Sequence, residues 1–298
     1  MHVNALVWPR YILNPHYGLH VTRGRGPFAD PVTNGFALFV CAAVCGVAIA
    51  TWSSRSARAL AALIGLICLA GSFLSLERSV WLGAAAACTI TMLSIRRLRP
   101  YVLPTAAVLV IGFVASITSI PGLGSSVSAR LSQASSIYDR ENLAEAALNM
   151  IKARPLTGFG WQRFQDDSLL YFRQSQSFPL TATTFAVHNF LLSYGVDLGL
   201  PGLTLWAFGL LAGLSSALRT RGPPDLSPWR VALLATVVMF AVVSNSVPPS
   251  LFPNLSLWLL AGVAFSGRYS TVRPQLAHRV CPEPAGRLAD RRLVGHPR

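Results

Sequence analysis

Three residues of this 298-residue sequence have side chains that could bind an anion or transfer a proton: Arg78, Arg140 and His188. Arginine stays charged and can bind phosphate oxygens through two parallel hydrogen bonds. Histidine can accept a proton from a hydroxyl group near neutral pH, and nearby arginines would lower its pKa and so keep it neutral. Two fixed cations and one base suit a substrate that has a pyrophosphate leaving group and a hydroxyl nucleophile.

Each of these residues also has a purely structural interpretation. Arg78 lies in LERSVWLG, where it could form an ion pair with Glu77 or anchor a helix end at the membrane interface. Arg140 could extend from a helix end into water, and His188 could be an interfacial residue beside packed helices. The sequence leaves these alternatives open for each residue taken alone.

The position of Arg140 favours a functional role. The segment SSIYDRENLAEAALNMIKARP, residues 135–155, has the pattern of an amphipathic helix that ends before Pro155. At 100° per residue, Arg140 falls within the apolar stripe that contains Leu143 and Met150. We therefore expect this helix to lie against the membrane domain and to direct one guanidinium inward.

The stretch HNFLLSYGVDLG begins with His188 and ends with Gly199. Eleven steps of 100° return to within about 20° of the start, so a helix would place these two residues and Gly195 on one face. Small residues there either let another helix approach closely or leave space for a bulky substrate below the ring. Asp197 is predicted on the opposite face, away from His188.

The composition indicates which elements must position these side chains. The chain is 52% hydrophobic and only 12% charged, and its apolar residues form long blocks. This pattern is typical of an all-α polytopic membrane protein. The formal charge of +14 comes almost entirely from arginine, and it is better explained by basic cytoplasmic loops than by nucleic-acid binding. The five cysteines predict neither a disulfide framework nor a metal site.

About seven transmembrane helices are expected. The fifth contains Pro201, so it could divide into a short interfacial helix and a span. The seven apolar stretches lie near residues 35–52, 59–76, 79–95, 101–120, 188–218, 230–247 and 251–266.

Arginines occur on alternate links between these stretches, so every basic link can be cytoplasmic at once. Arg78, Arg140 and His188 then all lie on the outer side. The N-terminus also lies outside with several arginines, which indicates either one misjudged helix or, as we favour, a longer protein with further N-terminal helices. The predicted regions are an extracytoplasmic segment 1–34, four transmembrane helices in 35–120, an extracytoplasmic loop with the amphipathic helix in 121–187, three transmembrane helices in 188–266 and a basic cytoplasmic tail 267–298.

Four segments, in this order, resemble the O-antigen ligase and Wzy-type O-antigen polymerase superfamily. Arg78 to Leu82 matches an Arg-three-residues-Leu motif, and His188 to Gly199 matches a His-ten-residues-Gly motif. The other two segments are RGPFADPVTNG (25–35) and RENLAEAALNMIKARPLTGFGWQRF (140–164).

The resemblance implies a GT-C-like, metal-independent glycosyltransferase without a cofactor. Such an enzyme moves a glycan from undecaprenyl pyrophosphate to a hydroxyl of a glycan or lipid acceptor, at the outer face of the cytoplasmic membrane. If the roles of the family's motif residues apply at the matching positions, Arg78 and Arg140 would bind the pyrophosphate and His188 would be the catalytic base. Gly195 and Gly199 would then shape the site. The implied partners are the lipid-linked glycan, the acceptor and membrane lipid, with no nucleic acid.

The sequence departs from the family in two respects. It has fewer helices, and Asp197 stands where the family often has Glu. Two other classes therefore remain: a transporter or flippase of lipid-linked sugars, or an inactive truncated membrane subunit. The predicted spans are almost free of internal charge, which favours chemistry at one face over a path through the membrane. Asp166 and Asp167 are expected to be a solvated pair rather than metal ligands.

Overall fold

The computed structural model describes residues 10–14, 23–119, 122–132, 135–172, 186–219 and 226–280. Over these residues the chain is helical, and none of them lies in a β-strand. Short 3-10 turns span Arg10–Leu13, Gly26–Phe28, Arg99–Tyr101 and Ser168–Leu170. The α-helices are α1 (Pro31–Thr51), α2 (Arg55–Phe73), α3 (Arg78–Ser94), α4 (Val102–Ser119), α5 (Leu123–Ser132), α6 (Ser135–Ala153), α7 (Phe164–Asp167), α8 (Phe190–Arg219), α9 (Ser227–Val243) and α10 (Leu251–Val280).

All seven predicted apolar stretches form helices, namely α1–α4 and α8–α10. Among the described residues, four helical segments are long and apolar enough to cross a bilayer: Pro31–Thr51, Arg55–Phe73, Arg99–Ser119 and Phe190–Arg219. Two further apolar helices, Ser227–Val243 and Leu251–Ser266, are shorter. The described part of the chain is thus all-helical and has the composition of a membrane protein, while seven spans and a GT-C-like arrangement remain predictions.

The core of the bundle lies between α1, α3, α8, α9 and α10. Its side chains are apolar and at most 8% exposed. A Cβ on Gly83 of α3 would lie 2.5 Å from the sulfur of Met239, which shows how closely α3 and α9 approach. The most deeply buried core residues include Phe36, Val80, Leu233, Met239 and Leu257.

Apolar side chains on α2 and α4 face outward. Leu66 is 65% exposed and Leu103 is 82% exposed. Aliphatic side chains with this exposure suit contact with lipid tails, because a bilayer imposes no cost on exposed apolar surface. This surface agrees with the membrane location of both helices.

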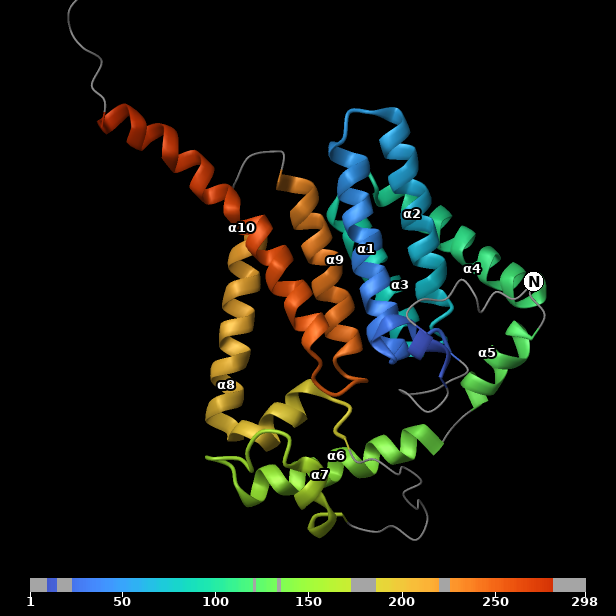
Figure 1. Cartoon of the computed structure of the whole chain (residues 1–298), viewed down its shortest axis with the longest axis vertical. Helices are drawn as coiled ribbons and strands as arrows, with labels where there is room; N and C mark the ends of the chain where they lie inside the picture. Colours follow the sequence, from blue (N-terminus) through green and yellow to red (C-terminus); the bar gives the residue numbers. More distant parts are fainter. Residues whose placement is uncertain are drawn as a thin grey trace, which may run out of the picture.

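Helix α8 is broken in the middle. Gly199 has φ 69° and ψ 179°, and Pro201 follows inside the helix. The segment Phe190–Leu198 therefore runs at an angle to the rest of α8 (Figure 1). The expected division of this stretch into two parts is confirmed. The prediction that His188 and Gly199 share one helix face is wrong, because His188 precedes the first helical residue and Gly199 is not helical.

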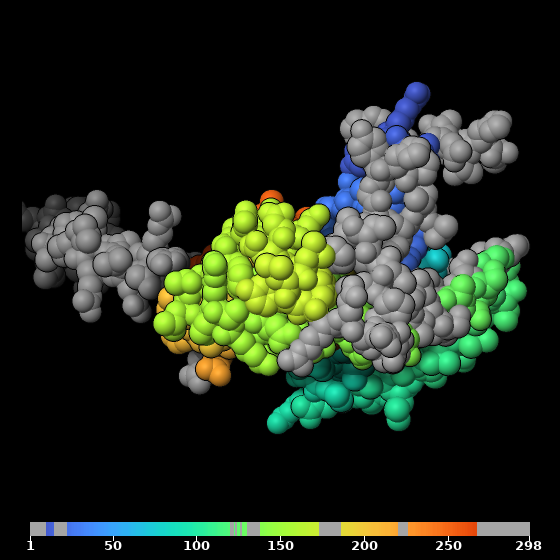
Figure 2. Space-filling model, turned by 90° about the horizontal axis from the view of Figure 1, so that it is seen from below, coloured from blue at the N-terminus to red at the C-terminus, as the bar shows by residue number. Residues whose placement is uncertain are grey.

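The bundle has two distinct ends. Helices α6 and α7 and the first part of α8 lie at one end, which we call the site end, whereas the link from α1 to α2 lies at the other (Figure 1). Viewed from the site end, the segment that includes α6 and α7 covers a large part of the molecular surface (Figure 2). Arg55 and Arg58 begin α2 at the opposite end, so the basic α1–α2 link is far from α6.

Candidate functional site

The predicted amphipathic helix is confirmed as α6. Leu143, Ala147 and Met150 are at most 1% exposed. They pack against Val196 of α8 and against Val187, which lies three residues before α8 begins. The apolar face of α6 is therefore turned toward the first part of α8, and this face carries Arg140 near its N-terminal end.

A cavity of about 290 Å³ opens between α6, the residues before α8 and the turn after α9. It contains both a guanidinium and an imidazole, which come from positions 48 residues apart in the sequence. The lining residues are Arg140, Glu141, Ala144, Val187, His188, Asn189, Leu192 and Asn245. The structure thus brings together two of the three residues that sequence analysis selected.

His188 lies in a bend, half-buried, two residues before α8 begins. Its Nδ1 atom lies 2.8 Å from the carbonyl oxygen of Ala186. A carbonyl oxygen can only accept, so Nδ1 carries the hydrogen and donates it. In the neutral ring the lone pair is then on Nε2, which is the nitrogen that could accept a proton from a substrate.

The surroundings of His188 lower the pKa of its ring below the ordinary value of 6.5. Burial is the largest cause, and the positive charge of Arg140 is the second. The Ala186 carbonyl and the charges of Asp30 and Asp139 act in the opposite direction. Since the lowering effects prevail, the ring is neutral near pH 7 and available as a base.

Arg140 lies in an environment shaped by other charges. Desolvation by the surrounding protein lowers the pKa of its guanidinium, Glu77 raises it, and Arg78 and Arg23 lower it further. An arginine retains its charge under such conditions because its ordinary pKa is so high. The side chain also remains accessible to solvent, so Arg140 is a charged group that a ligand could reach.

Arg78, the third predicted residue, is the first residue of α3 and is half-buried. It is absent from the cavity lining but lies close enough for its charge to act on Arg140. The structure thus places it near the other two residues without bringing it into the same cavity.

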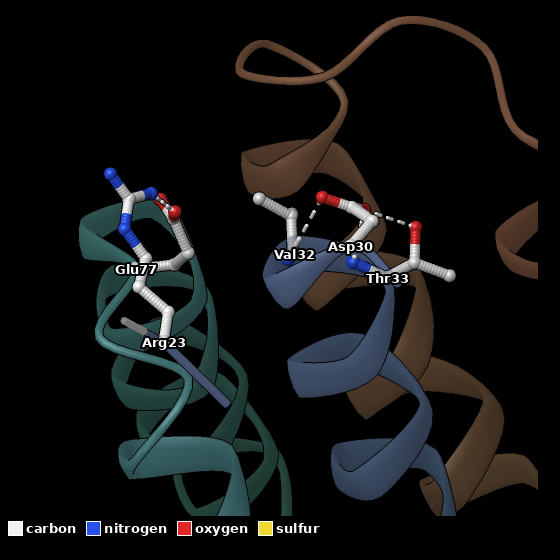
Figure 3. A network of polar contacts seen from close by, with 5 residues as sticks. All are labelled: Arg23, Asp30, Val32, Thr33 and Glu77. Carbon is white, nitrogen blue, oxygen red and sulfur yellow. Dashed lines mark hydrogen bonds and ion pairs between the residues drawn. The ribbon is translucent and has the colours of Figure 1, made fainter. Parts of the chain in front are cut away.

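Glu77 precedes Arg78 and forms an ion pair with Arg23 (Figure 3). The side chains of Arg23 and Glu77 are only 7% and 6% exposed, and the backbone N–H of Gly24 donates to the carbonyl of Leu74 at 3.3 Å. This arrangement fixes the segment before α1 against the α2–α3 link. The sequence suggested Arg78 as a partner for Glu77 and did not single out Arg23, which is 54 residues away.

The segment before α1 also places an acidic residue near the site. Asp30 caps α1: one carboxylate oxygen accepts from the backbone N–H of Thr33 at 2.8 Å and from its hydroxyl at 2.6 Å (Figure 3). The other oxygen accepts from the N–H of Val32 at 3.4 Å. Pro31 at the first helical position suits the start of a helix. Asp30 is therefore fixed in place where its charge acts on His188.

Gly195 and Gly199 allow the close approach of other segments, which is one of the two roles that the sequence left open. A Cβ on Gly199 would lie 2.8 Å from the backbone C and O of Leu156, and one on Gly195 would lie 2.8 Å from Cδ1 of Ile151. The face that carries these glycines is thus filled by α6 and the turn after it. The cavity beside His188 is lined by other residues, and a role of the two glycines in shaping the site stays a prediction.

The turn after α6 is joined to the break in α8 by backbone hydrogen bonds. The N–H of Leu200 donates to the carbonyl of Pro155 at 2.7 Å, and the N–H of Phe159 donates to the carbonyl of Val196 at 2.8 Å. Gly160 N–H donates to the carbonyl of Asp197 at 3.0 Å. These bonds satisfy backbone groups that the break in α8 would otherwise leave unpaired.

A protein-family model matches part of this chain. Residues 63–207 match the family model of O-antigen ligase (Wzy_C). Residues 63–207 are an O-antigen ligase domain. A comparison with curated proteins finds no match to this chain.

The O-antigen ligase domain contains Arg78, Arg140, His188 and the break in α8. The superfamily predicted from the four motifs is thereby confirmed. The match suggests a membrane enzyme that processes glycans in the manner of a glycosyltransferase, with a lipid-linked glycan and an acceptor as partners.

Two other polar features of the ligase domain have different roles. Asp166 and Asp167 form exposed ion pairs with Arg163 at 3.5 and 3.4 Å. Over the residues that the structure describes, no group of three or more His, Cys, Asp or Glu side chains could hold a metal ion.

Asn189 lines the cavity beside His188. Sequence analysis noted Asn189 only as the neighbour of that histidine.

Asn245, which lies outside the domain, is a cavity residue that sequence analysis missed entirely. It follows α9 in a polar turn and has no motif around it. The only signal in the sequence was the asparagine itself, at the end of an apolar stretch.

Proposed function

We propose that the protein is a membrane glycosyltransferase that moves or polymerises a glycan from undecaprenyl pyrophosphate onto an acceptor hydroxyl. The observation that carries this proposal is the cavity that Arg140 and His188 line together. It combines a fixed cation with a neutral base at one end of a helical membrane bundle. A reaction that transfers a glycan from a pyrophosphate to a hydroxyl needs both groups.

In the proposed reaction, Arg140 and Arg78 bind the pyrophosphate. The Nε2 atom of His188 takes the proton of the acceptor hydroxyl as its oxygen attacks the anomeric carbon of the donor glycan. The bond between that carbon and the pyrophosphate oxygen breaks, and undecaprenyl pyrophosphate leaves with the bonding electron pair. The guanidinium groups stabilise the charge that develops on the leaving group, so this reaction requires no metal ion or cofactor.

We further propose that the site end faces the outside of the cytoplasmic membrane. The basic α1–α2 link lies at the opposite end of the bundle, and basic links are retained on the cytoplasmic side. Residues 121–187 would then form the extracytoplasmic loop, and the tail from residue 267 would be cytoplasmic. With this orientation, the donor is used on the face where mature lipid-linked glycans are displayed.

The experiment uses the protein reconstituted in liposomes. Labelled lipid-linked glycans extracted from the source membranes serve as donor and acceptor, with EDTA present. We expect a longer glycan, or a glycan attached to the acceptor lipid, together with free undecaprenyl pyrophosphate. Movement of the labelled glycan across the bilayer without product would overturn the proposal in favour of a flippase. Loss of product on adding EDTA would overturn metal independence.

A further inference from the structure

His188 is held by its two chain neighbours in different ways. Val187 is 4% exposed and belongs to the apolar cluster between α6 and α8. On the other side, Asn189 begins a set of hydrogen bonds that leads to α9. His188 thus lies in the chain between a residue in apolar contact with α6 and a residue in polar contact with the turn after α9.

The side-chain amide of Asn189 makes two hydrogen bonds. Its Oδ1 accepts from the backbone N–H of Leu192 at 3.1 Å, which caps the first turn of α8. Its Nδ2 donates to Oδ1 of Asn245 at 3.0 Å. The Nδ2 of Asn245 donates in turn to the carbonyl of Ala241 at 2.7 Å. These partners assign the orientation of both amides consistently, since each oxygen accepts and each nitrogen donates.

A second hydrogen bond joins the same two elements. The backbone N–H of Phe190, the first residue of α8, donates to the carbonyl of Ser244 at 3.0 Å. A single hydrogen bond fixes the distance between two segments but still allows them to rotate relative to each other. Two bonds from adjacent residues, Asn189 and Phe190, also fix the orientation of the α8 N-terminus relative to α9.

We propose that the Asn189–Asn245 side-chain bridge positions His188 for proton transfer, with Asn245 acting through Asn189. This inference rests on the proposed function, because it concerns the base of that reaction. A base must lie within hydrogen-bond reach of the proton that it removes, and a displacement of about 1 Å can reduce the rate by about 10²-fold. Asn245 is therefore a positioning residue, whereas His188 is the catalytic one.

Two substitutions break the bridge from opposite sides. Asn189→Ser retains an oxygen that can cap α8 but removes the amide donor. Asn245→Leu removes the acceptor while retaining a similar side-chain volume. Each should lower kcat by about 10- to 100-fold and leave the donor KM unchanged, because the arginines are unaffected. The double variant should lose no more than either single variant, since both remove the same interaction.

Ser244→Ala is the matched control in the same turn. The hydroxyl of Ser244 donates to Ala241 within its own helix at 3.1 Å, and the backbone carbonyl that accepts from Phe190 is retained. We expect nearly unchanged kcat. Losses that add in the double variant, or that are matched by Ser244→Ala, would overturn the proposal. If Asn245→Leu does not fold, Asn189→Ser decides the outcome.

A second measurement does not depend on activity. Diethyl pyrocarbonate modifies the neutral imidazole, so the extent of His188 modification against pH, read by peptide mass spectrometry, reports its titration. The charged groups around the ring are Arg140, Glu141 and Asp139 on α6 and Asp30 before α1; the turn after α9 contributes the neutral Asn245. Breaking the bridge should expose the ring more to water and move its midpoint upward, toward the ordinary value.

The two measurements separate the two hypotheses. Wild-type titration and wild-type kcat in both bridge variants would overturn the positioning role and leave the proposed function intact. If the wild-type protein shows no transfer but both variants shift the titration of His188, the proposed function fails and the role in proton transfer fails with it; only the effect of the bridge on the surroundings of the ring then stands.

Discussion

The carbonyl of Ala186 determines which nitrogen of His188 is available to a substrate. Because Nδ1 donates to it at 2.8 Å, the basic lone pair of the neutral ring is on Nε2. Two neighbouring residues of α6 then act on the ring with opposite sign: Arg140 lowers its pKa, and Asp139 raises it. The activity of the base therefore depends on burial, which lowers the pKa of the ring most, and on the balance of these charges.

This balance predicts a pH dependence. The proposed reaction needs neutral His188, so kcat should fall as the pH decreases through the pKa of the ring, which lies below 6.5. Asp139→Asn removes a charge that raises this pKa, so the acidic limb of the kcat profile should move to lower pH. Arg140→Gln removes a charge that lowers the pKa of His188. The acidic limb of the kcat profile, measured on the activity that this variant retains, should therefore move to higher pH. Profiles that shift in the same direction would contradict the assignment of His188 as the base.

A separate prediction concerns the geometry with which the arginines bind phosphate oxygens. If Arg140 binds phosphate oxygens through its planar fork, charge alone does not replace it. Arg140→Lys should reduce kcat/KM by tens to thousands of times, which corresponds to roughly 2–5 kcal/mol for a contact with a charged ligand in a partly dry site. Arg78→Ala should lose nearly all activity. Full activity of both variants at equal expression would remove these arginines from the mechanism.

At the scale of elements, the break in α8 and the turn after α6 form one unit. Gly199 adopts a backbone conformation essentially restricted to glycine, with φ 69° and ψ 179°. The turn places backbone atoms of Leu156 against it. This contact helps to hold α6, and with it Arg140, in its position beside the first part of α8.

Gly199→Ala should therefore weaken the site through α6 rather than through direct contact with a substrate. The backbone strain alone costs about 1–3 kcal/mol, and the Cβ would also meet backbone atoms at 2.8 Å. We expect a lower thermal midpoint in detergent and a loss of donor binding. Gly209→Ala is the control in the same helix, because a Cβ there meets no atom within 4 Å. Equal behaviour of the two variants would show that the α6–α8 contact does not support the site.

The sequence predicted the positions of the helices better than it predicted where the helices break and how they contact one another. Long apolar runs determine where helices form in a membrane, and all seven expected stretches are helical. The stripe of α6 was also predictable, because Leu143 and Met150 follow the helical period. The shared face of His188 and Gly199 was not correctly predicted, since the helical period no longer applies where the backbone of Gly199 leaves the helix.

The tertiary pairs of the site could not be predicted from local pattern. Arg23 pairs with Glu77 across 54 residues, and Asn189 pairs with Asn245 across 56 residues. No periodicity relates such positions, because each pair forms only when separate helices pack. The site residues Arg140 and His188 were found because charge and a titratable ring are unusual in apolar surroundings.

At the scale of the whole molecule, the account requires that the two ends of the bundle face different compartments. Cysteine labelling tests this in a version of the protein without native cysteines. The two labelling variants are Leu170→Cys and Ser53→Cys. Leu170 is 88% exposed and lies in the predicted outer loop, and Ser53 is exposed in the α1–α2 link. An impermeant maleimide should label the former in intact cells and the latter only after permeabilisation. The reverse pattern would place the site on the cytoplasmic side.

The role of His188 as the base is tested by comparing His188→Gln with the wild-type protein in the liposome transfer assay. Glutamine can form hydrogen bonds but cannot accept a proton at neutral pH, and a general base contributes on the order of 10²–10⁴-fold to the rate. We expect His188→Gln to lose product formation by that factor and to retain binding of the pyrophosphate donor through the arginines. Product formation by His188→Gln at the wild-type rate would contradict the claim that His188 is the base of a glycan transfer.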